Sequence, residues 1–222
     1  MDLDEAMTTT FAAREFTDDD LPDDVLWRIL DTARFAPSGG NRQGAHITGV
    51  RDEADRRKLA EFSAPAARRY LAARAKGENP WNPVTASTVT QADLDAIAGV
   101  DAFVAPIANA PVDLVVTVDL GVLATLDKEL DRIGIAGGAS VYPLVWNILM
   151  QARAEGYGGT MTTMAIAAEP AVRDYFDIPD GHAVAAVVPL GKPVKQLTKL
   201  RRNPVPDFVT RDRYDGPPFE QP

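Results

Sequence analysis

The sequence predicts an α+β domain, and three features lead to this class. Two continuous apolar runs rich in valine, VDLVVTVD at 112–119 and AVAAVVPLG at 183–191, are typical of central strands covered on both faces. A strongly apolar helical pattern at 140–156 lies between them. Strands and helices do not alternate strictly along the chain as they do in a doubly wound fold. We therefore expect a central mixed sheet flanked by helices.

The first part of the chain predicts helices around one short strand. An amphipathic helix is expected over 23–34, because its apolar residues recur at helical spacing. These residues are Val25, Leu26, Ile29, Leu30 and Ala33. Acidic residues precede this stripe and Pro37 follows it, as at the ends of many helices. A strand is expected at 46–52. The alanine-rich segment 54–76 predicts two helices, broken near Pro65.

Residues 77–111 predict an irregular excursion from the domain. Four prolines and scattered glycine, asparagine and threonine residues leave room for at most one short helix, near 91–98. Excursions of this length are often lids or arms.

The helix expected at 140–156 has Pro143 in its first turn and Gly156 at its end. Besides the usual apolar stripe, Trp146 and Met150 make its other faces apolar. A helix that is apolar on nearly all sides lies either at the centre of its own domain or in a contact with a partner. We expect the second arrangement and therefore a homodimer.

Composition excludes several classes of protein. With 222 residues, of which 45% are hydrophobic, the chain is long enough to bury one core, so 1–222 is treated as a single domain. The absence of cysteine excludes disulfides and thiolate chemistry, and the two histidines are too far apart to suggest a metal site. A net charge of −9 argues against nucleic acid. No segment is apolar enough for a membrane span and the amino terminus is acidic, which favours the cytoplasm.

Two polar segments point to a ligand. The sequence FAPSGGNRQG at 35–44 holds more turn-forming and polar residues than a turn needs, which suggests that its backbone faces a bound molecule. Residues 192–202, KPVKQLTKLRR, carry five basic residues and no acidic one. This second segment is either a solvated tail or a site for an anion such as a phosphate.

Taken together in their order, these segments resemble the nitroreductase family. The resemblance is strongest at AREF, 13–16, followed by APSGGNRQ, 36–43, and at PLGKP, 189–193, before the basic segment. It also includes AEGYGGTMTT at 154–163 and covers nearly the whole chain except 77–111.

The resemblance implies an FMN-dependent oxidoreductase with NADH or NADPH as a transient electron donor. It also implies an intertwined homodimer with the two flavins at the subunit interface. The C-terminal segment 192–222 is then an arm. The flavin performs the electron chemistry, so no side chain is assigned as a catalytic acid or base, and no metal is expected.

The resemblance assigns the flavin-binding residues by position. They come from the N-terminal arginine, the polar loop, the segment after the long helix and the basic cluster, namely Arg14, Pro37, Ser38, Gly39, Gly40, Asn41, Gln43, Thr162, Thr163, Arg201 and Arg202. The backbone near Thr162 and Thr163 is expected to donate to the reactive edge of the flavin ring. For Gly158 and Gly159, a helix C-terminal turn is an equally good interpretation.

The chain also departs from the family pattern. It has Thr10-Phe11-Ala12 where members commonly carry basic residues and a serine, and Gly44-Ala45 where a Pro-Trp often follows the glutamine. The first change removes a phosphate contact, and the second makes the pocket roomier. Trp81 fits either a wall of the acceptor pocket or an anchor on the partner subunit.

Three functions are compatible with these residues. The first is electron transfer from NAD(P)H to a nitroaromatic, quinone or similar acceptor in a two-step flavin cycle. The second is a specialised reaction on the same fold, such as dehalogenation or consumption of the flavin. The third is flavin binding or storage without turnover.

Overall fold

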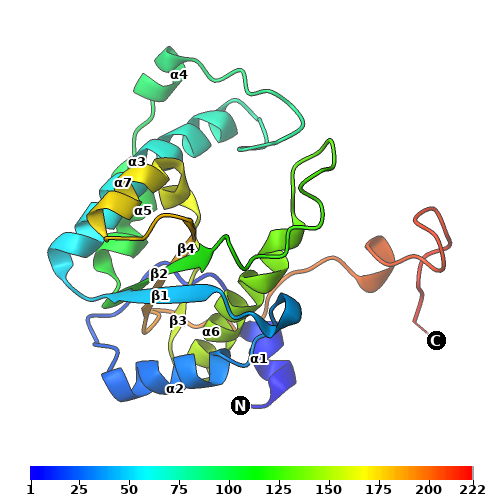
Figure 1. The fold of residues 1–222 in the computed structure, drawn as a ribbon, viewed down its shortest axis with the longest axis horizontal. Coiled ribbons are helices and arrows are strands. Elements are labelled where there is room, and N and C mark those ends of the chain that lie inside the picture. Colours follow the sequence, from blue (N-terminus) through cyan, green and yellow to red (C-terminus); the bar gives the residue numbers. More distant parts are fainter. Residues whose placement is uncertain (222) are drawn as a thin grey trace.

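A computed structural model describes residues 1–221 and shows a four-stranded sheet with helices on both faces (Figure 1). The strand order is β1-β2-β4-β3, and each neighbouring pair is antiparallel. The strands are β1 (Ala45–Val50), β2 (Val112–Asp119), β3 (Gly158–Gly159) and β4 (His182–Gly191). One isolated parallel bridge joins Ala12 to Gly159, so the sheet is mixed only at this edge. The α+β class is confirmed.

The two central strands separate two hydrophobic cores. Along β2, Leu114 and Val116 face a core that includes α2 and α6, whereas Val115 faces a core built with α3, α5 and α7. These are called the α2/α6 core and the α3/α5 core. This alternation follows from the two-residue period of a strand. Because both faces are covered, nearly all of β2 and β4 is buried, as their continuous apolar runs predict.

The helices surround this sheet in the order of the chain. They are α1 (Leu3–Thr9), α2 (Asp23–Ala33), α3 (Glu53–Ala75), α4 (Gln91–Asp95), α5 (Val100–Asn109), α6 (Tyr142–Ala154) and α7 (Glu169–Tyr175). Four 3₁₀ turns, η1 (Gly39–Asn41), η2 (Ala136–Ser140), η3 (Met164–Ala168) and η4 (Val205–Asp207), connect them or follow them. The helices predicted over 23–34 and 140–156 are present as α2 and α6. No helix within residues 1–221 has the length and apolar character needed to cross a membrane.

The prediction of two helices in segment 54–76 is wrong, because α3 runs unbroken through Pro65. Proline removes one backbone donor and costs about 3 kcal/mol inside a helix. The small residues that follow offset this cost by packing closely into the α3/α5 side of the molecule. Ala66, Ala67, Ala72 and Ala73 are all at most 3% exposed. A pattern of alanines gives little periodicity from which this burial can be predicted.

The excursion 77–111 is less irregular than expected. The short helix near 91–98 is present as α4, but the ten-residue α5 was missed. Pro106 lies inside α5 and is buried, and its neighbours Val104 and Ile107 belong to the α3/α5 core. The proline made a helix seem unfavourable, and tertiary packing outweighs that local preference.

A buried carboxylate lies in the middle of this structure. Asp113 on β2 is fully buried, and neither carboxylate oxygen has a hydrogen-bond partner within residues 1–221. Its side chain lies on the same face of the strand as Val115. Burial raises the pKa of Asp113 well above its ordinary value, and the charge of Arg56 opposes this shift only in part.

We expect Asp113→Asn to stabilise the protein at pH 8, by about 1 kcal/mol or more, because it removes the cost of burying a charge. A raised pKa in the folded state means that the contribution of Asp113 to stability is present at low pH. It is lost as the pH rises through the folded-state pKa. The advantage of the variant should therefore shrink as the pH falls toward about 4, the ordinary pKa of an unfolded aspartate. Urea unfolding between pH 4 and 8 measures this.

Asp101→Asn, on the exposed side of α5, is the control for a change in net charge. An Asp113→Asn protein that is less stable than wild type by the same amount at every pH would contradict the expectation.

Candidate functional site

The polar loop after α2 is held in a strained conformation. Three of its residues, Gly40, Asn41 and Gln43, have positive φ angles of 64°, 54° and 50°. Glycine adopts this region freely and asparagine tolerates it, but for glutamine it is uncommon. Ser38 fixes the turn, because its Oγ accepts a hydrogen bond from the Gln43 N–H at 3.0 Å. Strain of this kind persists only where the surrounding structure enforces it, and it concentrates at functional sites.

The polar loop is anchored to the end of η2, just before α6, and to the segment after β2. Ser140 Oγ accepts a hydrogen bond from the Gly39 N–H at 3.0 Å, and the Arg42 side chain donates to the Val122 carbonyl at 3.2 Å. The Asn41 side chain makes no hydrogen bond within the described part of the chain and is exposed. The loop therefore presents a free amide group from a fixed backbone.

A cavity of about 330 Å³, here called the loop cavity, lies beside this loop. Pro37, Ser38 and Gln43 line it, whereas Gly39, Gly40 and Asn41 do not. Sequence reasoning missed the remaining polar groups on its wall. They are Arg34, His46 and Ser140. His46 could have been found from its place at the start of the strand that follows the loop, but Ser140 is brought here only by the fold.

Arg14 lies in a second cavity of about 170 Å³, here called the arginine cavity, together with Thr162 and Thr163. The Arg14 guanidinium makes one weak hydrogen bond, to the Ala12 carbonyl at 3.4 Å, and no ion pair within residues 1–221. Thr162 is fixed by two backbone hydrogen bonds with Val187 of β4, at 2.9 and 2.8 Å. The structure thus brings together an unpaired cation and the segment predicted to donate to a flavin.

The Thr163 backbone offers a free donor. Its carbonyl accepts a hydrogen bond from the Ile166 N–H at 3.1 Å, but its own N–H donates to no group in the described chain. Because Thr163 is exposed in the arginine cavity, this N–H is available to a ligand.

The edge of the sheet determines where Arg14 lies. The Ala13 N–H donates to the Gly159 carbonyl at 2.9 Å, which places the N-terminal segment beside β3. A Cβ atom on Gly159 would lie 2.3 Å from the Pro189 carbonyl oxygen, so only glycine fits there. Gly158 and Gly159 therefore form a strand rather than a helix C-terminal turn. The glycine that ends α6 is Gly156, at φ +84°.

Two aromatic residues of the arginine cavity were not predicted. Tyr70 on α3 and Phe103 on α5 line it, with their ring centroids 5.3 Å apart. Both belong to the part of the chain whose helices were predicted least well. Their recognition as site residues required the packing of α3 against α5.

The two cavities lie on opposite faces of the sheet. Leu30 and Leu144, which line the loop cavity, pack against the α2/α6 core. Val104 and Ile107, which line the arginine cavity, belong to the α3/α5 core. One chain therefore does not bring the polar loop and Arg14 to the same place.

The basic cluster stands apart from both cavities. Arg201 and Arg202 line neither, are exposed, and make no ion pair with residues 1–221. The Arg202 side chain donates to the Arg201 carbonyl at 2.7 Å. The chain after β4 leads away from the sheet toward the C-terminus (Figure 1), and this cluster lies on that path.

A large apolar hollow of about 930 Å³ opens at the start of α6. Trp146 and Ile135 line this apolar hollow and are 40% and 72% exposed. Its rim is fixed by Asp127, whose carboxylate accepts hydrogen bonds from the Ile135 N–H at 2.7 Å and the Arg132 side chain at 2.8 Å. These donors, the Ile135 N–H first, lower the pKa of Asp127 to about 2. The loop that bears Ile135 at the edge of the hollow is thus held in place by Asp127, and several large apolar side chains of the hollow are exposed.

Comparison with known proteins identifies the family. The model of the Nitroreductase family matches residues 8–192. Among curated proteins, none matches the sequence significantly. Solved structures share the fold at low sequence identity. A BluB-like flavoprotein from Clostridium difficile 630 superimposes with a TM-score of 0.68 at 17% identity, over 96% of this chain and 100% of that one.

Two structures from Vibrio agree with this. Nitroreductase A from Vibrio parahaemolyticus gives a TM-score of 0.67 at 19% identity, over 95% of this chain and 75% of that one. NADPH:FMN oxidoreductase from Vibrio harveyi gives 0.66 at 18% identity, over 95% and 77%. With the family model matching most of its length and the fold shared over nearly all of it, this chain belongs to the nitroreductase family.

Proposed function

We propose that this protein binds FMN and moves electrons from NADH or NADPH to a small organic acceptor, such as a nitroaromatic compound or a quinone. The observation that carries the proposal is the arginine cavity. In it, Arg14, which forms no ion pair with residues 1–221, lies with the Thr163 N–H, which donates to no group in that range. Both stand at positions that the family motifs assign to the flavin.

The residues present fit this cofactor. An arginine without a carboxylate partner suits the phosphate, since a planar guanidinium binds phosphate oxygens in pairs. A backbone N–H held by the pairing of Thr162 with β4 suits a ring atom that gains electron density. When bound, FMN supplies the electron chemistry by accepting electrons from the nicotinamide and passing them to the acceptor. The protein holds, orients and shields the reacting groups.

The polar loop takes part if a second copy completes the site. Pro37, Ser38, Asn41 and Gln43 lie across the sheet from Arg14, so within one chain they do not reach the same flavin. A homodimer formed over the apolar hollow covers the exposed side chains around Trp146 and brings the loop of one copy to the arginine cavity of the other. Closed twofold symmetry then makes two equal sites.

The arginines of the C-terminal segment 192–222 complete the phosphate site in this proposal. Arg201 and Arg202 form no ion pair with residues 1–221, and an extended segment connects them to β4. Thr10 cannot replace them, because its side chain is buried and its Oγ1 donates to the Ala6 carbonyl at 2.7 Å. The phosphate therefore depends on Arg14 and this pair.

The absence of a basic residue at Thr10 favours a second candidate function. With fewer cations on the phosphate than family members commonly have, the chain binds or stores flavin without turnover. A specialised reaction on this fold, such as dehalogenation or flavin consumption, uses the same site. Reduction by a nicotinamide separates turnover from storage.

The first test is the colour of the protein. Purified protein supplied with FMN should stay yellow after gel filtration, lose its flavin absorbance when NADH or NADPH is added without oxygen, and regain it with a quinone. Protein that stays yellow with both nicotinamides would support flavin storage instead. Protein that retains no FMN at all would refute both functions.

The second test concerns the basic cluster. We expect Arg201→Ala and Arg202→Ala each to weaken FMN binding about tenfold to a hundredfold, because a charge-assisted contact contributes roughly 1.5–3 kcal/mol. Riboflavin, which lacks the phosphate, should bind each variant as it binds wild type. Fluorescence titrations with both flavins measure this. Lys195→Ala in the same segment is the control. If both arginine variants bind FMN normally, the cluster is a solvated tail.

The third test concerns the homodimer. Light scattering should give twice the mass of the chain, and Trp146→Glu should shift it toward the monomer because a charge would be buried in the contact. The same variant should lose FMN, since the site then lacks the loop of the second copy. Val84→Glu, at a side chain 91% exposed outside the apolar hollow, is the control. A monomeric wild type that retains FMN would overturn the shared site.

A further inference from the structure

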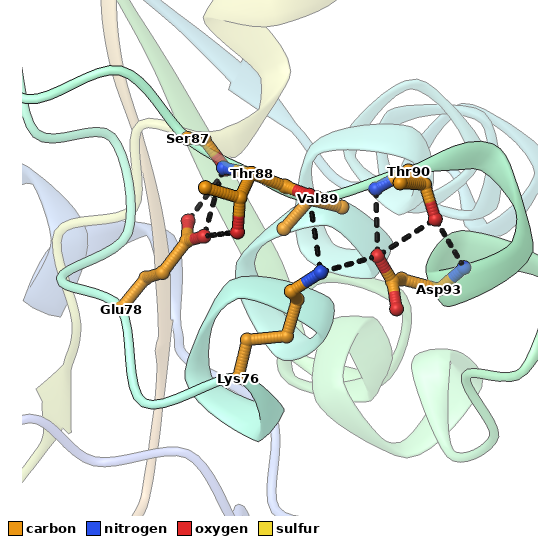
Figure 2. A network of polar contacts seen from close by, with 7 residues as sticks. All are labelled: Lys76, Glu78, Ser87, Thr88, Val89, Thr90 and Asp93. Carbon is orange, nitrogen blue, oxygen red and sulfur yellow. Dashed lines mark hydrogen bonds and ion pairs between the residues drawn. The ribbon is translucent and has the colours of Figure 1, made fainter.

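A loop between α3 and α4 is closed by its own polar contacts. This loop, residues 77–90, is called the arm. The Glu78 carboxylate accepts hydrogen bonds from the Ser87 hydroxyl at 2.6 Å and from the N–H and hydroxyl of Thr88 at 2.8 and 2.5 Å (Figure 2). These donors, Ser87 first, lower the pKa of Glu78. The start and the end of the arm are thus held together.

A second set of contacts ties the arm to the helices on either side. Lys76 Nζ, just after α3, donates to the Thr88 carbonyl at 3.0 Å and to Asp93 Oδ2 at 2.8 Å, and Asp93 also caps α4 through Thr90 (Figure 2). The hydrogen bond from Lys76 is the main cause, and those from Thr90 are smaller causes, of a pKa of Asp93 lowered to about 2. Both clamps are therefore charged at neutral pH, and the arm is preorganised.

A cavity of about 240 Å³, here called the arm cavity, lies between the arm and α3. Arg69 on α3 and Asn79, Trp81 and Asn82 on the arm line it. Trp81 has a φ of 58°, which is costly for a bulky residue. The clamped arm holds it there, and the residue is 53% exposed rather than packed into a core.

The polar groups of the arm cavity have few partners of their own. The Arg69 guanidinium lies 5.3 Å from the centroid of the Trp81 ring and forms no ion pair within residues 1–221. Asn82 Oδ1 accepts hydrogen bonds from the arm backbone, but its amide nitrogen donates to nothing in that range, and the Asn79 side chain is similarly unbonded. A cation, an aromatic surface and free amides suit a planar heterocycle that carries a phosphate.

The arm cavity and the arginine cavity both border the same turn of α3. Arg69 lines the first and the next residue, Tyr70, lines the second, and their side chains point about 100° apart around the helix. A dinucleotide donor must place its nicotinamide at the flavin while its adenosine half extends away from it. The sequence has no glycine-rich dinucleotide fingerprint to receive that half.

We propose that the arm cavity binds the adenosine phosphate half of NADH or NADPH. Arg69 binds a phosphate, the Arg69–Trp81 pair provides the stacking surface for the adenine, and the amides of Asn79 and Asn82 contact its polar edge. This inference rests on the proposed function, because it assumes that the arginine cavity receives the nicotinamide.

A binding experiment tests the cavity without catalysis. Calorimetric titration of ADP into FMN-saturated wild type should give a measurable affinity, which Arg69→Ala weakens about tenfold or more. Arg69→Lys should restore only part of it, because lysine keeps the charge and loses the planar stack. Arg74→Ala, an exposed arginine on the same helix outside the arm cavity, is the matched control and should bind ADP as wild type does.

Trp81→Gly separates a binding role from a structural one. Glycine accepts the positive φ without strain, so the melting temperature should not fall, whereas ADP binding should weaken about tenfold. A lower melting temperature with unchanged ADP binding would show that Trp81 only holds the arm.

A kinetic experiment then connects the cavity to electron donation. Arg69→Ala should raise the KM for NADH or NADPH about tenfold and leave unchanged the KM for reduced nicotinamide mononucleotide, which lacks the adenosine half. Equal effects on both donors, or no ADP binding by wild type at millimolar concentration, would overturn the proposal. If FMN is not retained but ADP binding still depends on Arg69, the proposed function fails while the arm cavity remains a nucleotide site.

Discussion

The backbone pairing of β4 determines where Arg14, Thr162 and Thr163 lie in the arginine cavity. β4 pairs along its length with β2 and, at its end, with the two glycines of β3. Val187 of the same strand exchanges two backbone hydrogen bonds with Thr162. Gly159 of β3 accepts a hydrogen bond from the Ala13 N–H, next to Arg14. A shift of one residue along β4 would turn its buried side chains to the other face and move both ends of the candidate site. The buried valines that specify this register therefore also specify the site.

The two central strands and the two helices of the α2/α6 core could be predicted from the sequence because their patterns are local. An amphipathic stripe predicts α2, and continuous valine-rich runs predict β2 and β4. Pro65 and Pro106 led to errors, because their local cost is outweighed by the packing of α3 against α5, which no short window of sequence records. The same packing explains why Tyr70 and Phe103 were not recognised.

The candidate site was predicted in part. Arg14, Thr162 and Thr163 come together although almost 150 positions separate them in the chain. This grouping came from the resemblance to a family, not from spacing. The division of the remaining residues between the two faces of the sheet could not be foreseen, because it depends on which side of β1 and α6 the polar loop emerges. The positive φ angles at Asn41, Gln43 and Trp81 also contradict local preference. Asn41 and Gln43 lie in the polar loop, which we propose contacts the flavin, and Trp81 lies in the arm, which we propose binds the adenosine half of the donor.

The placement of the two cavities on opposite faces of the sheet has a genetic consequence. If each complete site takes its arginine from one copy and its polar loop from the other, a defect in Arg14 and a defect in Asn41 fall on the same site when they are carried by different chains. In such a mixed dimer both defects lie in one site, and the other site is intact. Two inactive alleles of this gene would then complement each other within a single molecule, as alleles of a protein with self-contained sites do not.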